Sequence, residues 1–511
     1  MQLQLSSFDP SSESAGDLAV AVLAVPCFEG ELTENKLFVA LDKRLDGVLT
    51  RAVKDDQWKA KDGQTLSIHS HGKVAANRIF LVGLGTKKDF DSKDLRGYGA
   101  RVVKATQAVS ATSAGIALPV FDGDSAAQAR AVQFLTEGLS HGAYRFDKYY
   151  TGEKKKPFTV ETVQLLVPSD AKSDGKTNVF AKAVKRGQVI AEAVQLARHF
   201  VNEPAAVATP THIAAEATAL AKAKGMTVEV LGPAECKKLG MGMFLGVAQG
   251  SDEEPRVVHL TYKPKAPAAN KKTIALIGKG VTFDSGGMSL KTSEGMLDMK
   301  IDMSGAATVI AAMGALADLD CPHEVHAFTA LCENMLSGKS YHLGDVLHSM
   351  NGKTVEINNT DAEGRLTLGD AITYAIQVCK PDELYDFATL TGACMVALGP
   401  NIAGIMSNDK AVVDRWLVSG EKAGEEMWQL PLPKKLKEQL KSEIADMRNT
   451  GSRYGGALTA GLFLKEFVGD TPWVHVDLAG PASVDKESGH LAAGGTGFGV
   501  ATIVQHLVPQ D

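Results

Sequence analysis

The chain has 511 residues, of which 22% are charged and 44% belong to the hydrophobic set AVILMFWYC. These values exclude a single small module, an intrinsically disordered chain and a fibrous repeat, and they leave room for roughly two to four domains. The 54 Lys and Arg residues and the 60 Asp and Glu residues give a net charge of -6, which provides no whole-molecule attraction to nucleic acid or to anionic membranes.

The beginning of the chain lacks the basic and apolar regions of a secretory signal, which predicts a cytoplasmic protein. The longest apolar runs, such as residues 18–25, are much shorter than the roughly 20 residues that span a bilayer, so we expect no transmembrane helix. The six cysteines contain no CxxC pair. We therefore expect buried free thiols, with neither a disulfide framework nor a zinc knuckle.

The N-terminal third contains short strand and helix patterns. Residues 75–85 predict a strand that ends in glycines, residues 95–109 a helix, and residues 160–167 another strand. Gly83 and Gly85 begin a G-x-G motif, but Lys88 occupies the place of the third glycine of a dinucleotide fingerprint, so this motif gives little support for nucleotide binding.

A Lys-, Ser- and Asp-rich stretch at residues 154–176 precedes a long amphipathic helix pattern over residues 178–201. This change of composition predicts a domain boundary near residues 170–180. The expected division is an N-terminal α/β domain over residues 1–170, a linker helix over 171–200 and a larger C-terminal domain over 201–511.

The C-terminal part alternates apolar strand patterns with helix patterns. The expected strands lie at residues 257–262, 273–277, 324–330, 384–389 and 473–478. The expected helices between them include residues 305–319 and 366–378. This alternation predicts a larger α/β domain with a central, mostly parallel sheet flanked by helices.

Two segments resemble known catalytic or binding motifs but do not match them. HEVH, residues 323–326, lacks the second histidine of a zinc-protease HExxH because position 327 is Ala, and it fits a strand better. Gly338-Lys339-Ser340 resembles the end of a phosphate-binding loop, but Glu333 replaces its first glycine. The chain also contains no G-x-S-x-G nucleophile elbow.

The first segment with reactive groups is GKGVTFDSGGMSLK, residues 278–291, which continues directly from the strand predicted at 273–277. Its glycines allow a tight loop around a ligand, and Lys279, Asp284 and Lys291 are its reactive groups. Asp302 follows, just before an apolar helix. Asp302 is either a fourth reactive group or only the cap of that helix.

The second segment is NNTDAEGRL, residues 358–366. Asp361 and Glu363 are two residues apart, so in an extended segment both carboxylates project to the same side. Two such groups repel each other unless a cation or proton compensates. Each acidic residue taken singly is usually a turn former or a cap. With Asp284 and Asp302 added, however, the oxygen-rich set indicates a divalent metal site.

These residues resemble those of the leucyl aminopeptidase family. NTDAEGRL, residues 359–366, is the signature of that family, and the resemblance continues through GKGVTFDSGGMSLK, MKIDMSGAA, ATLTGA and YGGALTAGLFLKEFV. It covers about residues 180–511 in order. Residues 1–170 fit loosely, as the more variable α/β domain of the family.

The resemblance implies a site for two divalent metal ions, Mn²⁺ or Zn²⁺, in each subunit. In the family's arrangement Asp284 and Glu363 bridge the two ions, Asp361 completes one site, and Lys279 and Asp302 complete the other. A lysine can ligate a metal only as the neutral amine. A neighbouring dication is therefore expected to lower the pKa of Lys279.

The resemblance also implies two cationic catalytic groups. Lys291 corresponds to the lysine that stabilises the gem-diolate, and Arg365 to the arginine that holds a bicarbonate ion as general base. Four positions match the pocket for the first substrate residue: Met299, Thr389, Leu390 and Gly392. Met299 could alternatively be a core residue.

The expected function is therefore a metal-dependent aminopeptidase that releases leucine-like N-terminal residues from peptides and that assembles as a homohexamer. Two alternatives stay open at this point. One is a two-metal phosphoesterase, although such a site normally adds histidine ligands. The other is an additional DNA-binding or regulatory role, for which residues 154–176 could provide a basic patch, although the net charge gives it no support.

Overall fold

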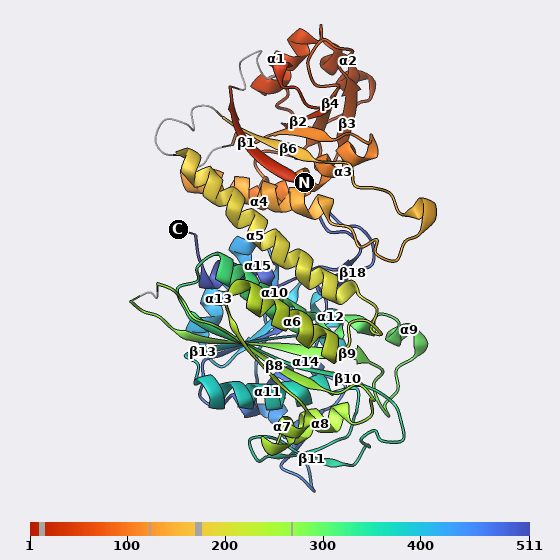
Figure 1. Ribbon diagram of the computed structural model, residues 1–511, viewed down its shortest axis with the longest axis vertical. Helices are drawn as coiled ribbons and strands as arrows, with labels where there is room; N and C mark the ends of the chain where they lie inside the picture. The colour runs from red at the N-terminus through yellow and green to blue at the C-terminus, as the bar shows by residue number, and fades with distance from the viewer. Residues whose placement is uncertain (10–15, 122–123, 169–175, 267–268, 511) are drawn as a thin grey trace. The chain divides into compact units, whose positions relative to one another are not determined.

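The computed structural model describes residues 1–9, 16–121, 124–168, 176–266 and 269–510, which Figure 1 traces from the N-terminus in red to the C-terminus in blue. The chain divides into two compact units, residues 1–192 with 486–492 and residues 193–485 with 493–510. Helix α5 (Lys176–Asn202) contains residues of both units. The boundary expected near residues 170–180 falls in part on residues 169–175, which lie outside the described residues, so it stays a prediction.

The N-terminal unit is built on a six-stranded sheet with the order β1-β6-β5-β2-β4-β3. All neighbouring strands are parallel except β3, which runs antiparallel to β4. The strands are β1 (Gln2–Phe8), β2 (Val22–Cys27), β3 (Thr65–His69), β4 (Arg78–Gly83), β5 (Ser113–Ala117) and β6 (Thr162–Pro168). The helices are α1 (Lys36–Arg44), α2 (Val48–Asp55), α3 (Leu95–Ala108) and α4 (Ser125–Ala143).

Strand β2 shows how this sheet is covered on both faces. Val22 and Ala24 belong to the apolar core that includes α3 and α4, whereas Leu23 and Val25 belong to the core that includes α1. Alternate side chains of a strand point to opposite faces, so the unit has three layers. The strand expected at 75–85 and the helix expected at 95–109 are confirmed as β4 and α3.

The C-terminal unit is built on an eight-stranded sheet with the order β15-β14-β17-β13-β9-β10-β8-β7. Its centre, β17-β13-β9-β10, is parallel, and antiparallel pairs occur only towards the edges of this sheet. Its strands are β7 (Thr227–Leu231), β8 (Arg256–Tyr262), β9 (Thr273–Asp284), β10 (Glu324–Asn334), β13 (Glu383–Ala388), β14 (Ala403–Ser407), β15 (Met427–Gln429) and β17 (Trp473–Asp477). The predicted α/β class with a mostly parallel centre is confirmed.

Helices cover both faces of this sheet, with α6, α10 and α15 on one face and α7, α8 and α11 on the other (Figure 1). The helices of the unit are α6 (Pro210–Lys224), α7 (Pro233–Lys238), α8 (Gly242–Ala248), α9 (Ser293–Met296), α10 (Ser304–Asp318), α11 (Gly364–Cys379), α12 (Gly392–Leu398), α13 (Lys410–Ala423), α14 (Gly456–Val468) and α15 (Val500–Leu507). Two small sheets add β11 (Val346–His348), β12 (Thr354–Glu356), β16 (Met447–Arg448), β18 (Ser483–Val484) and β19 (Gly494–Gly495).

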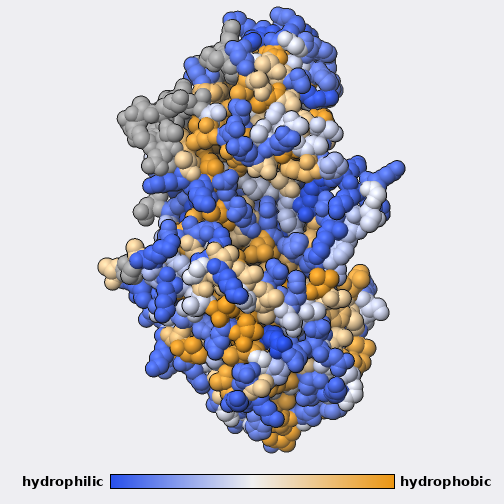
Figure 2. Space-filling model, viewed as in Figure 1, coloured by the Kyte–Doolittle hydropathy of each residue, from blue (hydrophilic) through white to orange (hydrophobic). Residues whose placement is uncertain are grey.

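Helix α10 is apolar on all sides because it lies in the core. The stretch Ser293–Asp318 is long and apolar enough to cross a membrane by length and composition, but 83% of its apolar window is buried inside the fold. On the face of the molecule that Figure 2 shows, hydrophobic residues form small groups among hydrophilic ones. All six cysteines are free, and five of them are buried.

Two sequence-based expectations on strands can now be compared with the structure. Strand β9 continues to Asp284, well beyond the predicted end at residue 277, so Lys279 and Asp284 lie on a strand and the expectation of a loop there is wrong. Glycines at 278 and 280 weaken the strand pattern, but the parallel pairing with β10 overrides them. The HEVH segment is not helical, and its last three residues begin β10, as expected.

Candidate metal centre

The candidate centre forms where the parallel strands of the large sheet end. Asp284 is the last residue of β9, Asn334 the last of β10 and Asp477 the last of β17, while Thr389 follows β13 directly. These strands are neighbours and run in the same direction. Their carboxyl ends therefore bring polar residues from distant parts of the sequence to one edge, as is usual for open α/β sheets.

The side chain of Lys279, on β9, contacts oxygen atoms of three residues. Its Nζ lies 2.7 Å from Asp302 Oδ1, 2.9 Å from Glu363 Oε1 and 3.1 Å from the carbonyl oxygen of Thr389. A Cβ atom at Gly364 would lie 2.4 Å from Lys279 Cε. Position 364 must therefore be glycine for the lysine to reach Glu363.

The charge of Lys279 is stabilised by its surroundings. Burial alone lowers the pKa of this amine, but the charges of Asp302, Glu363 and Asp284 outweigh burial and raise the pKa above its ordinary value. The carboxylates thus raise the pKa of Lys279, whereas a bound dication is expected to lower it. The lowered pKa of Lys279 in the metal-bound protein stays a prediction.

Asp284 is held by three groups at the end of β9. Its Oδ1 accepts hydrogen bonds from Gly286 N (2.9 Å) and Asn334 Nδ2 (2.8 Å). Its Oδ2 lies 2.8 Å from Lys291 Nζ, and Lys291 forms a second ion pair with Asp361. Gly286 has a φ of +85°, and a Cβ atom there would lie 2.9 Å from Asp361 Oδ1, so glycine allows this tight turn.

Asp361 and Glu363 lie in a turn just before α11. The expectation of an extended segment is wrong: residues 360–361 form a turn, and Glu363 has helical backbone angles (φ -76°, ψ -35°) as the cap of α11. Asn359 Oδ1 accepts a hydrogen bond from Asp361 N (2.9 Å) and tightens the turn. Ligand atoms of Asp284, Asp361 and Glu363 nevertheless all lie within 4.8 Å of one another. The carboxylates converge because the chain turns.

Asp302 belongs to the same cluster. It lies in a short 3₁₀ helix, Met299–Met303, whereas the cap of α10 is Met303. Its Oδ1 accepts from Lys279 Nζ and from Thr389 Oγ1 (2.7 Å). The alternative that Asp302 is only a helix cap is therefore wrong.

The cluster carries more negative charge than its lysines compensate. Burial raises the pKa values of Asp302, Asp361 and Glu363, and neighbouring carboxylates raise them further. Asp302 Oδ2 and Glu363 Oε2 are buried and have no hydrogen-bond partner. Buried carboxylate oxygens without partners beside an amine nitrogen are the donor set that divalent cations prefer. The residues present fit the expected pair of metal ions.

Arg365 lies in the first turn of α11, and only 7% of the residue is exposed. Its Nη1 donates to the carbonyl oxygen of Asn449 (2.8 Å), whereas its Nε has no hydrogen-bond partner. Burial lowers the pKa of the guanidinium to about 10, so it stays charged near neutral pH. A buried cation with a free donor suits an anion.

The four predicted pocket residues lie on two segments that meet at the cluster. Thr389 and Leu390 connect β13 to α12, Gly392 is the first residue of α12, and Met299 begins the 3₁₀ helix that contains Asp302. The hydrogen bond from Thr389 to Asp302 joins the two segments. Met299 is partly exposed, so it is not a core residue, and a Cβ atom at Gly392 would meet nothing within 4 Å. Their role in substrate binding stays a prediction.

The sequence analysis missed three residues that hold this site in place. Asn334 donates to Asp284, and Asp477 accepts from Leu390 N (3.2 Å) and Thr391 Oγ1 (2.7 Å). Both are polar residues at the end of an apolar strand, and this position is the signal that could have identified them. The third, Asn449, lies in an irregular segment without any such signal.

Comparisons with known proteins agree with this geometry. Residues 195–504 match the model of the cytosol aminopeptidase family, catalytic domain, and residues 24–153 match the N-terminal domain of the same family. Two relatives named "probable cytosol aminopeptidase" are 42% identical (from a Cyanothece species, 98% of this chain and 99% of the relative) and 41% identical (from Gloeobacter violaceus, 98% and 100%).

Two solved structures also match this chain over nearly its full length. A mutant of tomato leucine aminopeptidase matches with a TM-score of 0.88 and 32% identity over 100% of this chain and 97% of the other. The bottromycin maturation enzyme BotP in complex with Mn matches with a TM-score of 0.83 and 33% identity over 96% and 99% of the two chains.

Proposed function

Since the chain belongs to the cytosol aminopeptidase family and is therefore a peptide hydrolase, we propose that it removes leucine-like N-terminal residues from peptides with the help of two divalent metal ions. The family membership confirms the resemblance found in the sequence. The observation that carries the two-metal proposal is the largely buried cluster of four carboxylates with Lys279 and Lys291, in which two carboxylate oxygens lack partners.

The family resemblance supplies the ligand set. Asp284 and Glu363 would hold both ions, Asp361 would complete one site, and Lys279 and Asp302 would complete the other. The geometry supports this set, because ligand atoms of Asp284, Asp361 and Glu363 lie within 4.8 Å of one another and Lys279 Nζ lies 2.9 Å from Glu363 Oε1. Two bound ions supply an activated water and stabilise developing negative charge, the established chemistry of two-metal sites. The match to the bottromycin maturation enzyme BotP in complex with Mn supports Mn²⁺, and Zn²⁺ suits the same mixed oxygen and nitrogen ligands.

The chain's own cations act on the reacting peptide. Lys291, with 17% of its side chain exposed, can turn its ammonium towards the scissile carbonyl and stabilise the gem-diolate. Arg365 would hold bicarbonate through its free Nε, and this anion would serve as the general base. Neither step requires a covalent acyl-enzyme.

Substrate selection is proposed to depend on the two segments beside the cluster. Asp302 lies where a free α-amino group can be held, which explains removal of only the first residue because an internal peptide bond has no such group. Met299, Thr389, Leu390 and Gly392 form the pocket for the first side chain. Cytoplasmic location and a homohexameric assembly are part of the same proposal and rest on the family resemblance.

The test is hydrolysis of a leucyl amide before and after chelation. We expect chelation to abolish turnover and Mn²⁺ or Zn²⁺ to restore it, whereas N-acetylated leucyl amide stays intact because it lacks the free amine. Turnover that survives complete metal removal would contradict the proposal. Faster hydrolysis of a phosphodiester than of the leucyl amide would favour the phosphoesterase alternative.

A further inference from the structure

The turn that carries Asp361 and Glu363 depends on one distant side chain. Asn449 Oδ1 accepts hydrogen bonds from Asn358 N (3.0 Å) and Asn359 N (3.4 Å). Its Nδ2 donates to the carbonyl oxygens of Asn359 (2.6 Å) and Ala362 (3.4 Å). A single amide thus spans the turn on both sides of Asp361.

The position of Asn449 is itself fixed by backbone pairing. It follows β16, which pairs with β12, and its N donates to the carbonyl oxygen of Glu356 (3.0 Å). The next residue, Thr450, donates from its N to Asn358 Oδ1 (3.1 Å). Asn449 is fully buried, so any group that loses its partner here stays without water.

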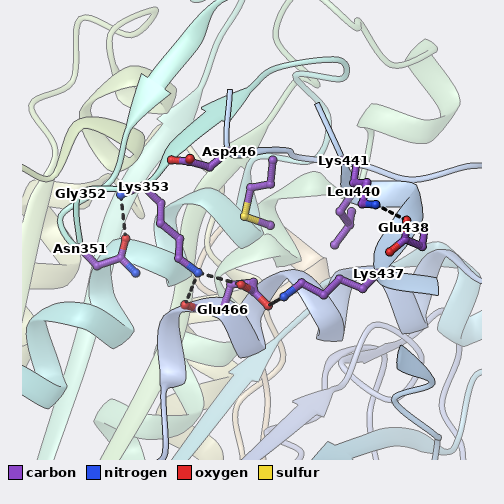
Figure 3. Close-up of a pocket in the computed structure, with 10 residues that line it drawn as sticks. Asn351, Gly352, Lys353, Lys437, Glu438, Leu440, Lys441, Asp446 and Glu466 are labelled. Carbon is purple, nitrogen blue, oxygen red and sulfur yellow. Dashed lines mark hydrogen bonds and ion pairs between the residues drawn. The ribbon is translucent and has the colours of Figure 1, made fainter. Parts of the chain in front are cut away.

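A cavity borders the strand that precedes Asn449. It has a volume of about 520 Å³ and is lined in part by Met447 of β16. Figure 3 shows Glu466 between Lys353 and Lys437 in this cavity. Both lysines form ion pairs with Glu466. Because these charges compensate each other, the cavity indicates no particular ligand.

The same residue also holds Arg365. The carbonyl oxygen of Asn449 accepts from Arg365 Nη1 (2.8 Å). One buried residue therefore connects the turn with two carboxylates of the cluster to the arginine beside it. A shift of Asn449 would move both.

We propose that Asn449 is a positioning residue of the metal centre: it fixes the turn that places Asp361 and Glu363 as ligands and keeps Arg365 in register with them. This inference rests on the proposed function. Removing a group that orients metal ligands typically weakens metal binding about 10- to 100-fold. A residue that only stabilises the fold would lower the melting temperature without this loss.

The test measures Mn²⁺ binding to the full chain by metal analysis after equilibrium dialysis, together with leucyl amide turnover and thermal unfolding. We expect N449A to bind Mn²⁺ about 10- to 100-fold more weakly, with turnover partly restored by excess Mn²⁺. N449D keeps the shape and the acceptor atom but loses the donor to Asn359 and Ala362, so it should also bind more weakly. If N449A does not fold, the Mn²⁺ affinity of N449D tests the inference instead.

The matched control is N408A. Asn408 also bridges two backbone groups, the carbonyl oxygen of Thr471 (2.9 Å) and the N of Trp473 (2.9 Å), but it does so at the start of β17, at the opposite end of this strand from Asp477. N408A should lower the melting temperature and leave Mn²⁺ affinity unchanged. Wild-type Mn²⁺ affinity in a folded N449D, or an equal loss of affinity in N408A, overturns the inference.

The two proposals fail in different ways. A wild-type chain that binds Mn²⁺ but does not hydrolyse the leucyl amide would contradict the proposed function. The comparison of Mn²⁺ affinities would still decide the role of Asn449, because it does not depend on turnover.

Discussion

Lys279 and Glu363 form a buried ion pair of 2.9 Å between the middle of β9 and the start of α11. Each side chain is at most 4% exposed. The pair is close because Gly364 has no side chain in the path of the lysine. A strand and a helix that are distant in sequence thereby bring an amine and a carboxylate into contact.

E363Q should reduce leucyl amide turnover by at least about 100-fold, because the variant loses a charged ligand of the proposed metal site. The metal-free variant should be no less stable than the metal-free wild type. Burial raises the pKa of Glu363, which means that its ionised form is unfavourable in the folded chain. Thermal unfolding in chelator and steady-state kinetics check both points. E438Q, on an exposed residue outside the cluster, is the control, and near-normal turnover in E363Q would contradict the ligand assignment.

K291M should lower kcat about 100- to 1000-fold, the usual cost of removing one group that stabilises an oxyanion. Metal content should not fall, because the lysine competes with the metals for Asp284 and Asp361 in the metal-free chain. Metal analysis beside kinetics separates the two effects. K291R should not restore kcat, since a planar guanidinium does not replace a compact ammonium. A kcat within twofold of wild type in K291M would exclude the proposed role.

G392L should change which substrates are preferred. Nothing lies within 4 Å of a Cβ atom at Gly392, so the fold leaves room for a side chain to begin there, and a leucine should extend into the space proposed for the substrate side chain. The ratio of kcat/KM for leucyl amide to that for alanyl amide should fall about 10-fold, a typical effect of a few methylene groups. The matched control is G338L, because Gly338 is also exposed with open space around its Cβ position. An unchanged ratio would place the pocket elsewhere.

Acid should destabilise the C-terminal unit through His506. Burial is the main cause that lowers the pKa of this imidazole to about 4 from 6.5, and its ring nitrogens contact Tyr385 Oη (2.8 Å) and Ser419 Oγ (2.9 Å). Between pH 6.5 and 4 the unfolded chain binds more protons than the folded one, so the free energy of unfolding falls as the pH falls. The resulting loss in the free energy of unfolding is about 2 kcal/mol, which is less than the full pKa shift implies because the residue is partly exposed to solvent.

H506Q should lack this part of the pH dependence, because it has no imidazole to protonate. As the pH falls to 4 the wild type should lose stability through His506, so the difference in the free energy of unfolding between the two proteins should become smaller. Urea unfolding at several pH values measures the difference. H348Q, on an exposed histidine, should keep the wild-type slope. Parallel pH profiles of wild type and H506Q would show that His506 is not the group responsible.

Much of the fold could be predicted because its signals are local. The apolar runs and the helix patterns gave the central strands and α10 and α11 to within a few residues, since hydrophobic periodicity depends on neighbouring positions. The end of β9 was placed too early for the same reason. Glycines weaken a local strand pattern, whereas the pairing with β10 that extends the strand to Asp284 is not local.

The class of the fold and the acidic and basic residues of the candidate centre could be predicted from apolar patterns and motifs. How these residues converge could not: Asp361 and Glu363 lie in a turn, Asp302 is bonded to Lys279 and Thr389, and Asn449 supports the turn from a distant segment. A composition or a motif records only which groups are present. Hydrogen bonds between remote segments depend on the order of strands in the sheet, which no local pattern contains.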